Sequence, residues 1–255
     1  MKLMIIRHAE PDYVHDSLTE KGRVEAAALA EYLKDKEMTH IYLSPLGRAQ
    51  KTAAYTLEKL GRTGETLNWM REFSARVRCW EIPEMEAGMP YEYEEDRVKG
   101  ALAWDILPSY WTTKPEMFDR FGWRDCDLCK HSNMIEKYDE VIAGLDALLE
   151  KHGYVREGDL YRVVRSNSDT VTLFCHFGLE CVILSRILNI SPFVLWHGFC
   201  ALPSSVTMVN TEERRKGIAY FRMSQFGDLS HLRLANEEPS FHARFCECYE
   251  DDTLH

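Results

Sequence analysis

The stretch KLMIIRHAEPDY, residues 2–13, decides the fold that we expect for this chain. Its first half, residues 2–7, is a short apolar run of the kind that forms a buried strand. The run ends at charged residues, so the strand delivers Arg7 and His8 at its carboxyl end. Ligands of α/β proteins bind beyond the carboxyl ends of the parallel strands. Arg7 and His8 are therefore the first candidates for a functional site.

A helix, a second strand and a second helix follow this strand. Residues 18–33 carry apolar side chains at approximately helical spacing, and Thr19 is a suitable N-cap. Residues 39–44 form another apolar run that predicts a strand, and residues 46–60 predict a helix that ends at Gly61. Strands that alternate with helices predict a parallel sheet covered by helices, so the expected class is α/β.

The second half of the chain continues this pattern. Residues 133–152 form an amphipathic helix with apolar residues at the i, i+3, i+4 and i+7 positions. Strand-like runs follow at residues 161–165 and 170–176, with a turn signal between them. Residues 205–209 and 218–223 alternate between apolar and polar side chains, which predicts a closing hairpin.

Residues 73–132 interrupt the alternation of strands and helices. The region from residue 61 to residue 132 contains five tryptophans and four prolines. Aromatic side chains in that number need burial, so the region is not a flexible linker. We expect a single domain over residues 1–255, in which residues 73–132 form an irregular, partly helical cap over the site.

The composition excludes several classes of protein. With 31 basic and 41 acidic residues the formal net charge is −10, which argues against a broad basic face for nucleic acid. No apolar run has the length of a membrane span, and the N-terminus lacks the apolar core of a signal peptide. We therefore expect a cytoplasmic protein that binds neither nucleic acid nor membrane. An anionic substrate must be caught by a local cluster of arginine and histidine.

Two arginines and two histidines are expected to meet at the carboxyl ends of the predicted strands. Arg7 and His8 follow the first strand, Arg48 lies in the segment after the second, and His176 ends a later one. An arginine guanidinium presents a rigid fork of donors to phosphate oxygens. A neutral imidazole is a nucleophile, since the ordinary histidine pKa is about 6.5. Together these groups predict a pocket that transfers a phosphoryl group through a phosphohistidine without a metal.

These segments resemble the histidine phosphatase superfamily, whose fold is typified by cofactor-dependent phosphoglycerate mutase. The strongest similarity is the order of RHA and SPLGRAQKTA at strand–helix–strand spacing. The resemblance implies a three-layer α/β sandwich with a mostly parallel central sheet, phosphoglycerate mutase-like, with a cap insertion. The matching segments are IIRHAEPDY (5–13), LTEKGRVEAAALAEYL (18–33), IYLSPLGRAQKTA (41–53), REF (71–73), CHFG (175–178) and FGDLSHL (226–232).

The resemblance also implies a role for each candidate residue. His8 accepts the phosphoryl group, and His176 completes the pocket. Arg7 and Arg48 clamp the phosphate. Glu72 takes the place of the family's acid, which protonates the leaving oxygen and later deprotonates the attacking water. The implied substrate is a small phosphorylated metabolite, and the reaction needs neither a cofactor nor a metal.

The sequence departs from the family pattern at several positions. No L-x-E motif precedes Glu72, so Glu81 and Glu84 are alternatives for the acid. The usual RHG is RHA here, which places Ala9 where glycine is common. The usual late HGG reads HFG, so Phe177 forms part of the pocket wall.

Two further departures bear on the activity. The asparagine that often follows the first motif is missing, and Asp12, His15 and Asp16 are the residues that stand near its place. The mutases' E-R-H-Y-G stretch is absent, because residues 72–76 read EFSAR. The absence of this stretch favours a metal-independent phosphomonoesterase over a mutase. The alternatives are a mutase-type phosphotransferase and a non-catalytic protein that binds a phosphorylated ligand; substrate identity and oligomeric state stay open.

The cysteines suggest a competing zinc site. Cys126 and Cys129 form a C-x-x-C motif that is followed by His131. The residues that would complete the site are Cys79 or the Cys246 and Cys248 pair. A lone C-x-x-C is a weak signal, so we expect buried thiols rather than a metal site.

Overall fold

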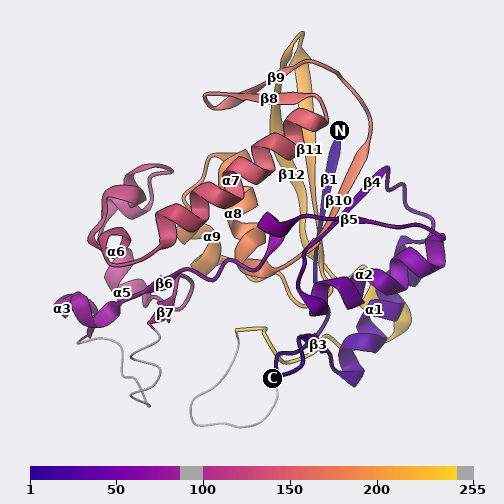
Figure 1. Ribbon diagram of the computed structural model, residues 1–255, viewed down its shortest axis with the longest axis horizontal. Helices are drawn as coiled ribbons and strands as arrows, with labels where there is room; N and C mark the ends of the chain where they lie inside the picture. Colours follow the sequence, from indigo (N-terminus) through magenta and orange to yellow (C-terminus); the bar gives the residue numbers. More distant parts are fainter. Residues whose placement is uncertain (87–99, 246–255) are drawn as a thin grey trace. The chain divides into compact units, whose positions relative to one another are not determined.

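The computed structural model describes residues 1–86 and 100–245 (Figure 1). The chain divides into two compact units. The first, called here the sheet unit, consists of Met1–Glu72, His152–Glu180 and the described residues from Cys200 onward. The second, called here the helical unit, consists of the described residues of Phe73–Lys151 together with Cys181–Phe199.

Within the described ranges, eight strands of the sheet unit form one mixed sheet (Figure 1). Their order is β5-β4-β10-β1-β11-β12-β9-β8. The pairs from β5 to β1 are parallel and those from β1 to β8 are antiparallel, so the parallel strands occupy one half of the sheet. The predicted α/β class is confirmed. The strands are β1 (Lys2–Arg7), β4 (His40–Leu43), β5 (Glu65–Thr66), β8 (Tyr154–Glu157), β9 (Leu160–Val163), β10 (Thr170–Cys175), β11 (Val206–Arg215) and β12 (Ile218–Asp228).

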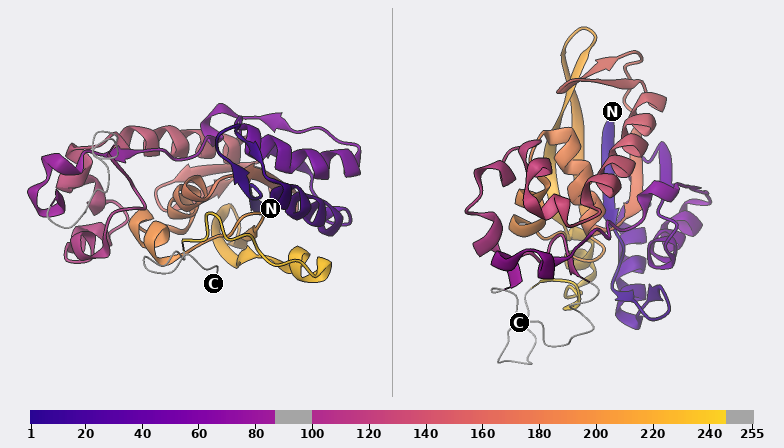
Figure 2. Two further views of the ribbon diagram at one scale, coloured as in Figure 1. Left: turned by 90° about the horizontal axis from the view of Figure 1, so that it is seen from below. Right: turned by 60° about the vertical axis from the view of Figure 1, so that its left-hand side comes forward.

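Strands β1 and β10 are almost continuously apolar because they lie inside the sheet. Every residue of β10 is buried, and in β1 only Lys2 is exposed. Continuous burial rather than alternation is what a strand covered on both faces requires. The predicted closing hairpin is formed by β11 and β12, and it extends beyond the amino end of β1 (Figures 1 and 2).

Helices α1 (Glu20–Leu33) and α2 (Gly47–Leu60) share one apolar core with the sheet. The Thr19 hydroxyl accepts a hydrogen bond from the Gly22 amide, which confirms the predicted N-cap. Gly61 ends α2 in the left-handed conformation at φ 60°, as predicted. Full burial of a leucine such as Leu29 stabilises the fold by about 1.5–3 kcal/mol. The buried members of this core are Met4, Ile6, Leu29, Leu33, Met38, Ile41, Leu43, Ala53, Phe174 and Val206.

Three helices account for much of the helical unit. The predicted helix over residues 133–152 is confirmed as α7 (Met134–Lys151). Helix α8 (Phe177–Leu188) begins in the sheet unit and continues into the helical unit, where α9 (Pro192–Gly198) follows. The other short elements of the chain are β2 (Pro11–Asp12), β3 (Ser17–Leu18), η1 (Asn68–Met70), β6 (Arg76–Val77), η2 (Cys79–Glu81), α3 (Pro83–Glu86), β7 (Ala101–Leu102), α5 (Pro108–Trp111), η3 (Pro115–Met117), η4 (Gly122–Asp125), α6 (Asp127–Lys130) and α10 (Ser230–Ala235).

Aromatic side chains form the core of the helical unit. The Trp123 ring is fully buried and contacts the Tyr138 ring edge-on, with centroids 4.9 Å apart. Trp111 is also buried and packs beside Phe193. The described residues of this segment, 73–86 and 100–132, thus pack through aromatic contacts rather than through a periodic apolar stripe. Over residues 1–86 and 100–245, no helix has the combination of length and apolar character that a membrane span needs.

Candidate active site

The register of the parallel strands brings the predicted histidines together. Arg7, the last residue of β1, pairs with Cys175, the last residue of β10. His8 and His176 are the next residues of the two segments, so they leave the sheet side by side. Their ring centroids are 5.1 Å apart, and the rings are tilted by 59°. Ser44 follows β4, the neighbour of β10, at the same edge of the sheet.

The hydrogen bond made by His8 fixes which of its nitrogens carries the proton. The Nδ1 atom lies 2.8 Å from the carbonyl oxygen of Ala9. A carbonyl oxygen only accepts, so Nδ1 donates and the lone pair of the neutral ring is on Nε2. Burial lowers the pKa of His8 well below its ordinary value, and the charges of Arg7 and Arg48 lower it further. The ring is therefore neutral at neutral pH, with its lone pair on Nε2.

His176 is held by a serine that the sequence motifs contain but to which no role was assigned. The His176 Nε2 atom lies 2.7 Å from the Ser44 hydroxyl oxygen, and the ring is fully buried. The same hydroxyl accepts a hydrogen bond from the Leu46 amide at 3.2 Å. Burial lowers the pKa of His176 well below the usual value, and His8, Arg48 and Arg7 add to the effect. Both imidazoles of the pair are consequently uncharged.

Asp16 orients Arg48 and binds the first turn of α2. Its carboxylate accepts a hydrogen bond from Arg48 Nη1 at 2.8 Å and another from the Gly47 amide at 2.6 Å. Burial would raise the pKa of Asp16, but the hydrogen bonds from Gly47 and Arg48 outweigh it and lower the pKa. Of the three residues considered near the first motif, Asp12 instead pairs with His15 on an exposed turn, at 2.7 Å.

Arg7 is anchored through one of its terminal nitrogens. The Arg7 Nη1 atom donates to the main-chain carbonyls of Ala201 and Ala243, and the guanidinium lies over the Phe177 ring at 5.5 Å. Among the described residues, the buried Nε atoms of Arg7 and Arg48 have no hydrogen-bond acceptor. Buried donors of this kind require an acceptor, which phosphate oxygens can supply.

Glu72 lies beside the first turn of α8. Its Oε1 atom accepts a hydrogen bond from the Leu179 amide at 3.1 Å, three residues after His176. The alternative acids both belong to the helical unit, where they have other partners. Glu81 binds Arg78 at 2.9 Å and His131 at 2.7 Å, and Glu84 faces Lys114 at 3.2 Å. The structure thus places Glu72, and neither alternative, in the unit that holds the two histidines.

Glu180 is a buried acid that the sequence motifs did not single out. It follows His176 by one helical turn, and its amide donates to the His176 carbonyl at 2.9 Å. The pKa of Glu180 is raised to about 7, mainly by burial and to a smaller extent by the charge of Glu72. The Thr207 hydroxyl and the charge of Arg7 lower it, but they do not outweigh burial. The i, i+4 spacing from His176 was the available signal, because residues four apart share a helix face.

The cysteine cluster lacks a metal-binding arrangement in the described part of the chain. Cys126 and Cys129 are buried with their sulfurs 3.6 Å apart, and Cys129 donates to the Trp123 carbonyl at 3.2 Å. His131 uses its Nδ1 atom for the ion pair with Glu81. Over residues 1–86 and 100–245, no group of three potential ligands includes these cysteines. The proposed partners Cys246 and Cys248 lie outside the described residues.

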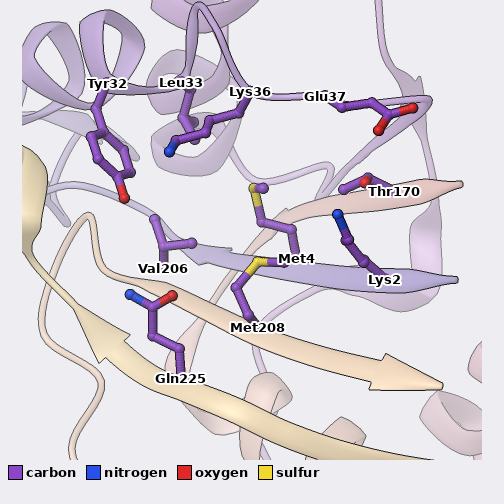
Figure 3. A pocket seen from close by; sticks show the side chains of 10 residues that line it. All are labelled: Lys2, Met4, Tyr32, Leu33, Lys36, Glu37, Thr170, Val206, Met208 and Gln225. Atoms are coloured by element: carbon purple, nitrogen blue, oxygen red, sulfur yellow. The ribbon is translucent and has the colours of Figure 1, made fainter. Parts of the chain in front are cut away.

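A separate cavity of about 190 Å³ opens in the sheet unit (Figure 3). Met4 and Met208 are paired across β1 and β11 and lie side by side in its lining, to which Lys2 and Lys36 also belong. None of the candidate site residues lines this cavity, so it is distinct from the histidine pair.

Known proteins share sequence features and the fold with this chain. The sequence model of the histidine phosphatase superfamily (branch 1) matches residues 3–223. A search of curated proteins gave no match. The matched range contains every residue of the candidate site: Arg7, His8, Asp16, Ser44, Arg48, Glu72, His176 and Glu180.

Several solved structures share the fold. A mutant phosphoserine phosphatase from Entamoeba histolytica in complex with phosphoserine superposes with a TM-score of 0.57 at 17% identity, covering 91% of this chain and 98% of that chain. A mycobacterial glucosyl-3-phosphoglycerate phosphatase gives 0.55 at 18% identity, covering 89% and 99%. The alpha-ribazole phosphatase from Shigella flexneri gives 0.55 at 15% identity, covering 89% and 96%. These similarities confirm the predicted phosphoglycerate mutase-like fold.

Proposed function

Because the chain belongs to the histidine phosphatase superfamily, we propose that it is a metal-independent phosphomonoesterase that acts on a small phosphorylated metabolite. The phosphoryl group passes through a covalent intermediate on His8. The similar structures are named as phosphatases of three different phosphate esters, which supports hydrolysis as the reaction type.

The observation that carries the proposal is the state of His8. Its Nδ1–H is fixed by the Ala9 carbonyl, so the Nε2 lone pair is available beside His176 and within the field of two guanidinium groups. A buried neutral imidazole needs no deprotonation before it attacks phosphorus. The positive surround stabilises the charge on the phosphoryl oxygens in the transition state.

The proposed reaction has two displacements. In the first, Nε2 of His8 forms a bond to phosphorus while the ester P–O bond breaks, and Glu72 donates a proton to the departing alcohol oxygen. In the second, Glu72 takes a proton from water, the water oxygen bonds to phosphorus, and the P–N bond breaks. The bonding electrons return to Nε2. The sum is an ester and water converted to an alcohol and inorganic phosphate.

The test is turnover of a panel of phosphate monoesters by the wild type and by His8→Ala. We expect hydrolysis by the wild type and a loss of at least about 10³-fold in His8→Ala, because the nucleophile is removed. The matched control is His15→Ala, which removes an exposed imidazole whose partner is Asp12. Equal turnover by His8→Ala and the wild type, or no hydrolysis of any ester by the wild type, would contradict the proposal.

A further inference from the structure

Three side chains of metal-binding type come together in the sheet unit, apart from the candidate active site. They are His40, His152 and Asp169, and their ligand atoms all lie within 4.8 Å of one another. His40 is the first residue of β4, and Asp169 directly precedes β10. These two strands are parallel neighbours, so the cluster lies at their amino ends. His8 and His176 follow the carboxyl ends of β1 and β10, at the opposite edge.

The cluster joins three separate segments of the chain. His152 directly follows α7, which leads into β8 (Figure 1). The start of β1, marked N in Figures 1 and 2, lies at the same end of the sheet. An ion bound by all three side chains would therefore connect β4, β10 and the turn between α7 and β8.

One pair of ligand atoms has nearly the spacing found around a four-coordinate metal, and the whole set lies within 4.8 Å. The Nε2 atom of His40 lies 3.5 Å from the Oδ2 atom of Asp169. Zinc bonds of about 2.0–2.1 Å in tetrahedral geometry separate two ligand atoms by about 3.3 Å. The rings of His40 and His152 have centroids 4.5 Å apart and are tilted by 55°.

His152 has the kind of hydrogen-bond partner that orients a metal-bound histidine in other proteins. Its Nε2 atom lies 3.0 Å from the Tyr42 hydroxyl, and its carbonyl accepts a hydrogen bond from the Asn167 side chain at 2.9 Å. If Nε2 donates its proton to the Tyr42 oxygen, the lone pair of the neutral ring lies on Nδ1. A hydrogen bond from the second ring nitrogen is the usual means by which proteins orient a metal-binding imidazole.

Exposure and charge indicate which ions fit. The side chains of His40 and Asp169 are 41% and 23% exposed, so an ion can enter from solvent, while His152 is buried. Arg165 Nη1 lies 3.9 Å from the same Asp169 oxygen, and the N-terminal ammonium of Met1 also feels the Asp169 charge. Two imidazoles and one partly neutralised carboxylate do not suit magnesium or calcium, which require several oxygen ligands. The set suits Zn²⁺ and similar transition-metal ions.

We propose that His40, His152 and Asp169 form a binding site for a Zn²⁺ ion, with solvent in the remaining coordination position. The bound ion connects the amino ends of β4 and β10 to the turn before β8, all within the sheet unit. It lies at the opposite strand ends from the phosphate chemistry, so it stabilises the fold and takes no part in ester hydrolysis. The site stands independently of the proposed function.

The test is calorimetric titration of Zn²⁺ into the full-length chain after removal of bound metal with a chelator. We expect one equivalent to bind to the wild type and to raise its melting temperature. His40→Gln and Asp169→Asn each remove one ligand, and we expect each to weaken Zn²⁺ binding at least about 10-fold and to reduce the thermal shift. Both positions are partly exposed, and melting curves without metal show whether the variants are folded.

Two matched controls locate the ion. His15→Gln alters another exposed histidine–aspartate pair, with Asp12 at 2.7 Å, and leaves Zn²⁺ binding unchanged. The Cys126→Ser, Cys129→Ser double variant leaves it unchanged as well. The proposal is overturned if the wild type binds no stoichiometric Zn²⁺, if folded His40→Gln and Asp169→Asn bind it as the wild type does, or if only the cysteine variant loses it. We expect ester hydrolysis to be unchanged when the chelator is added. Loss of hydrolysis on chelation would show that the ion takes part in the reaction.

Discussion

The imidazole of His8, the proposed nucleophile, owes its neutral state to its main chain and to its burial. The Ala9 carbonyl selects the tautomer, and burial with the charges of Arg7 and Arg48 keeps the ring neutral. Since the pKa of His8 lies well below the ordinary value, protonation of the nucleophile does not limit the reaction near neutral pH.

Replacement of Glu72 by glutamine tests the proposed acid. The Glu72 carboxylate lies beside the turn that follows His176. Glutamine keeps nearly the same side-chain volume, but it cannot transfer the proton. We expect Glu72→Gln to lower kcat by about 10²–10⁴-fold, the usual contribution of general acid–base catalysis. Glu81→Gln and Glu84→Gln serve as controls, because their partners are Arg78, His131 and Lys114. A silent Glu72→Gln together with a severe defect in either control would reassign the acid.

The raised pKa of Glu180 predicts that the free energy of unfolding depends on pH. The substitution Glu180→Gln removes this contribution. Burial raises the pKa of Glu180 from 4.5 to about 7 in the folded state. Between these pH values the folded chain holds a proton that the unfolded chain has lost, so stability falls as the pH rises through this range and is level above it. The total loss is on the order of 3 kcal/mol. Glu180→Gln carries no such proton and is expected to gain stability relative to the wild type over the same range.

Urea unfolding at pH 5 and pH 8 measures this difference. The exposed Glu58 of α2 provides the control, since Glu58→Gln leaves the pH dependence of the wild type unchanged. Parallel stability curves for Glu180→Gln and the wild type would show that Glu180 does not titrate in this range.

At the scale of the elements, local patterns account for most of what the sequence predicted. Apolar runs identified β1, β4 and β10, and the carboxyl-end rule brought His8 and His176 together. The contacts Ser44–His176 and Asp16–Arg48 were not predicted, because each joins side chains on different segments. Periodicity determines which face of an element is buried, but it does not select the polar partner across a strand boundary.

At the amino end of α2, the main chain of Gly47 lies close to the main chain of Asp16. The position of Arg48 depends on this contact. A Cβ atom at Gly47 would lie 2.1 Å from the Asp16 carbonyl oxygen, which is main chain and has to move. We therefore expect Gly47→Ala to displace Asp16, to raise KM for phosphate esters about 10-fold or more, and to destabilise the fold by about 1–3 kcal/mol.

The other end of the same helix supplies the control. Gly61 adopts a conformation that favours glycine, with φ 60°, but a Cβ atom there meets nothing within 4 Å. Gly61→Ala is expected to destabilise the fold by about 1–2 kcal/mol through backbone strain and to leave the kinetics unchanged. Urea unfolding and steady-state kinetics of both variants separate the two effects. Equal kinetic behaviour of the two would exclude a role for the Gly47 contact.

At the scale of the whole molecule, sequence patterns do not determine which elements share a compact unit. Residues 73–132 were expected as an insertion, whereas the helical unit also includes α7 and the later part of α8 with α9. The reason is physical. The amphipathic pattern of α7 shows that one face is buried, as at Leu145 and Leu149, but not which unit buries it. Aromatic pairs such as Trp123 and Tyr138 hold this unit together, and they leave no periodic signal.

The candidate site holds positively charged side chains in a molecule whose net charge is negative. A chain of formal charge −10 repels anions on average, yet Arg7 and Arg48 face one buried pair of imidazoles. Attraction of a phosphate ester therefore has to be local, and it depends on the donors held at the strand ends. That local cluster is also what makes His8, rather than another nucleophile of the chain, the expected carrier of the phosphoryl group.

The most direct measurement identifies the residue that carries the phosphoryl group during turnover. The wild type is mixed with a phosphate ester, quenched in alkali, in which phosphohistidine survives, and digested for mass spectrometry. We expect a phosphohistidine on His8 in the wild type and none in His8→Ala. A phosphoryl group found on another residue, or one that persists in His8→Ala, would contradict it.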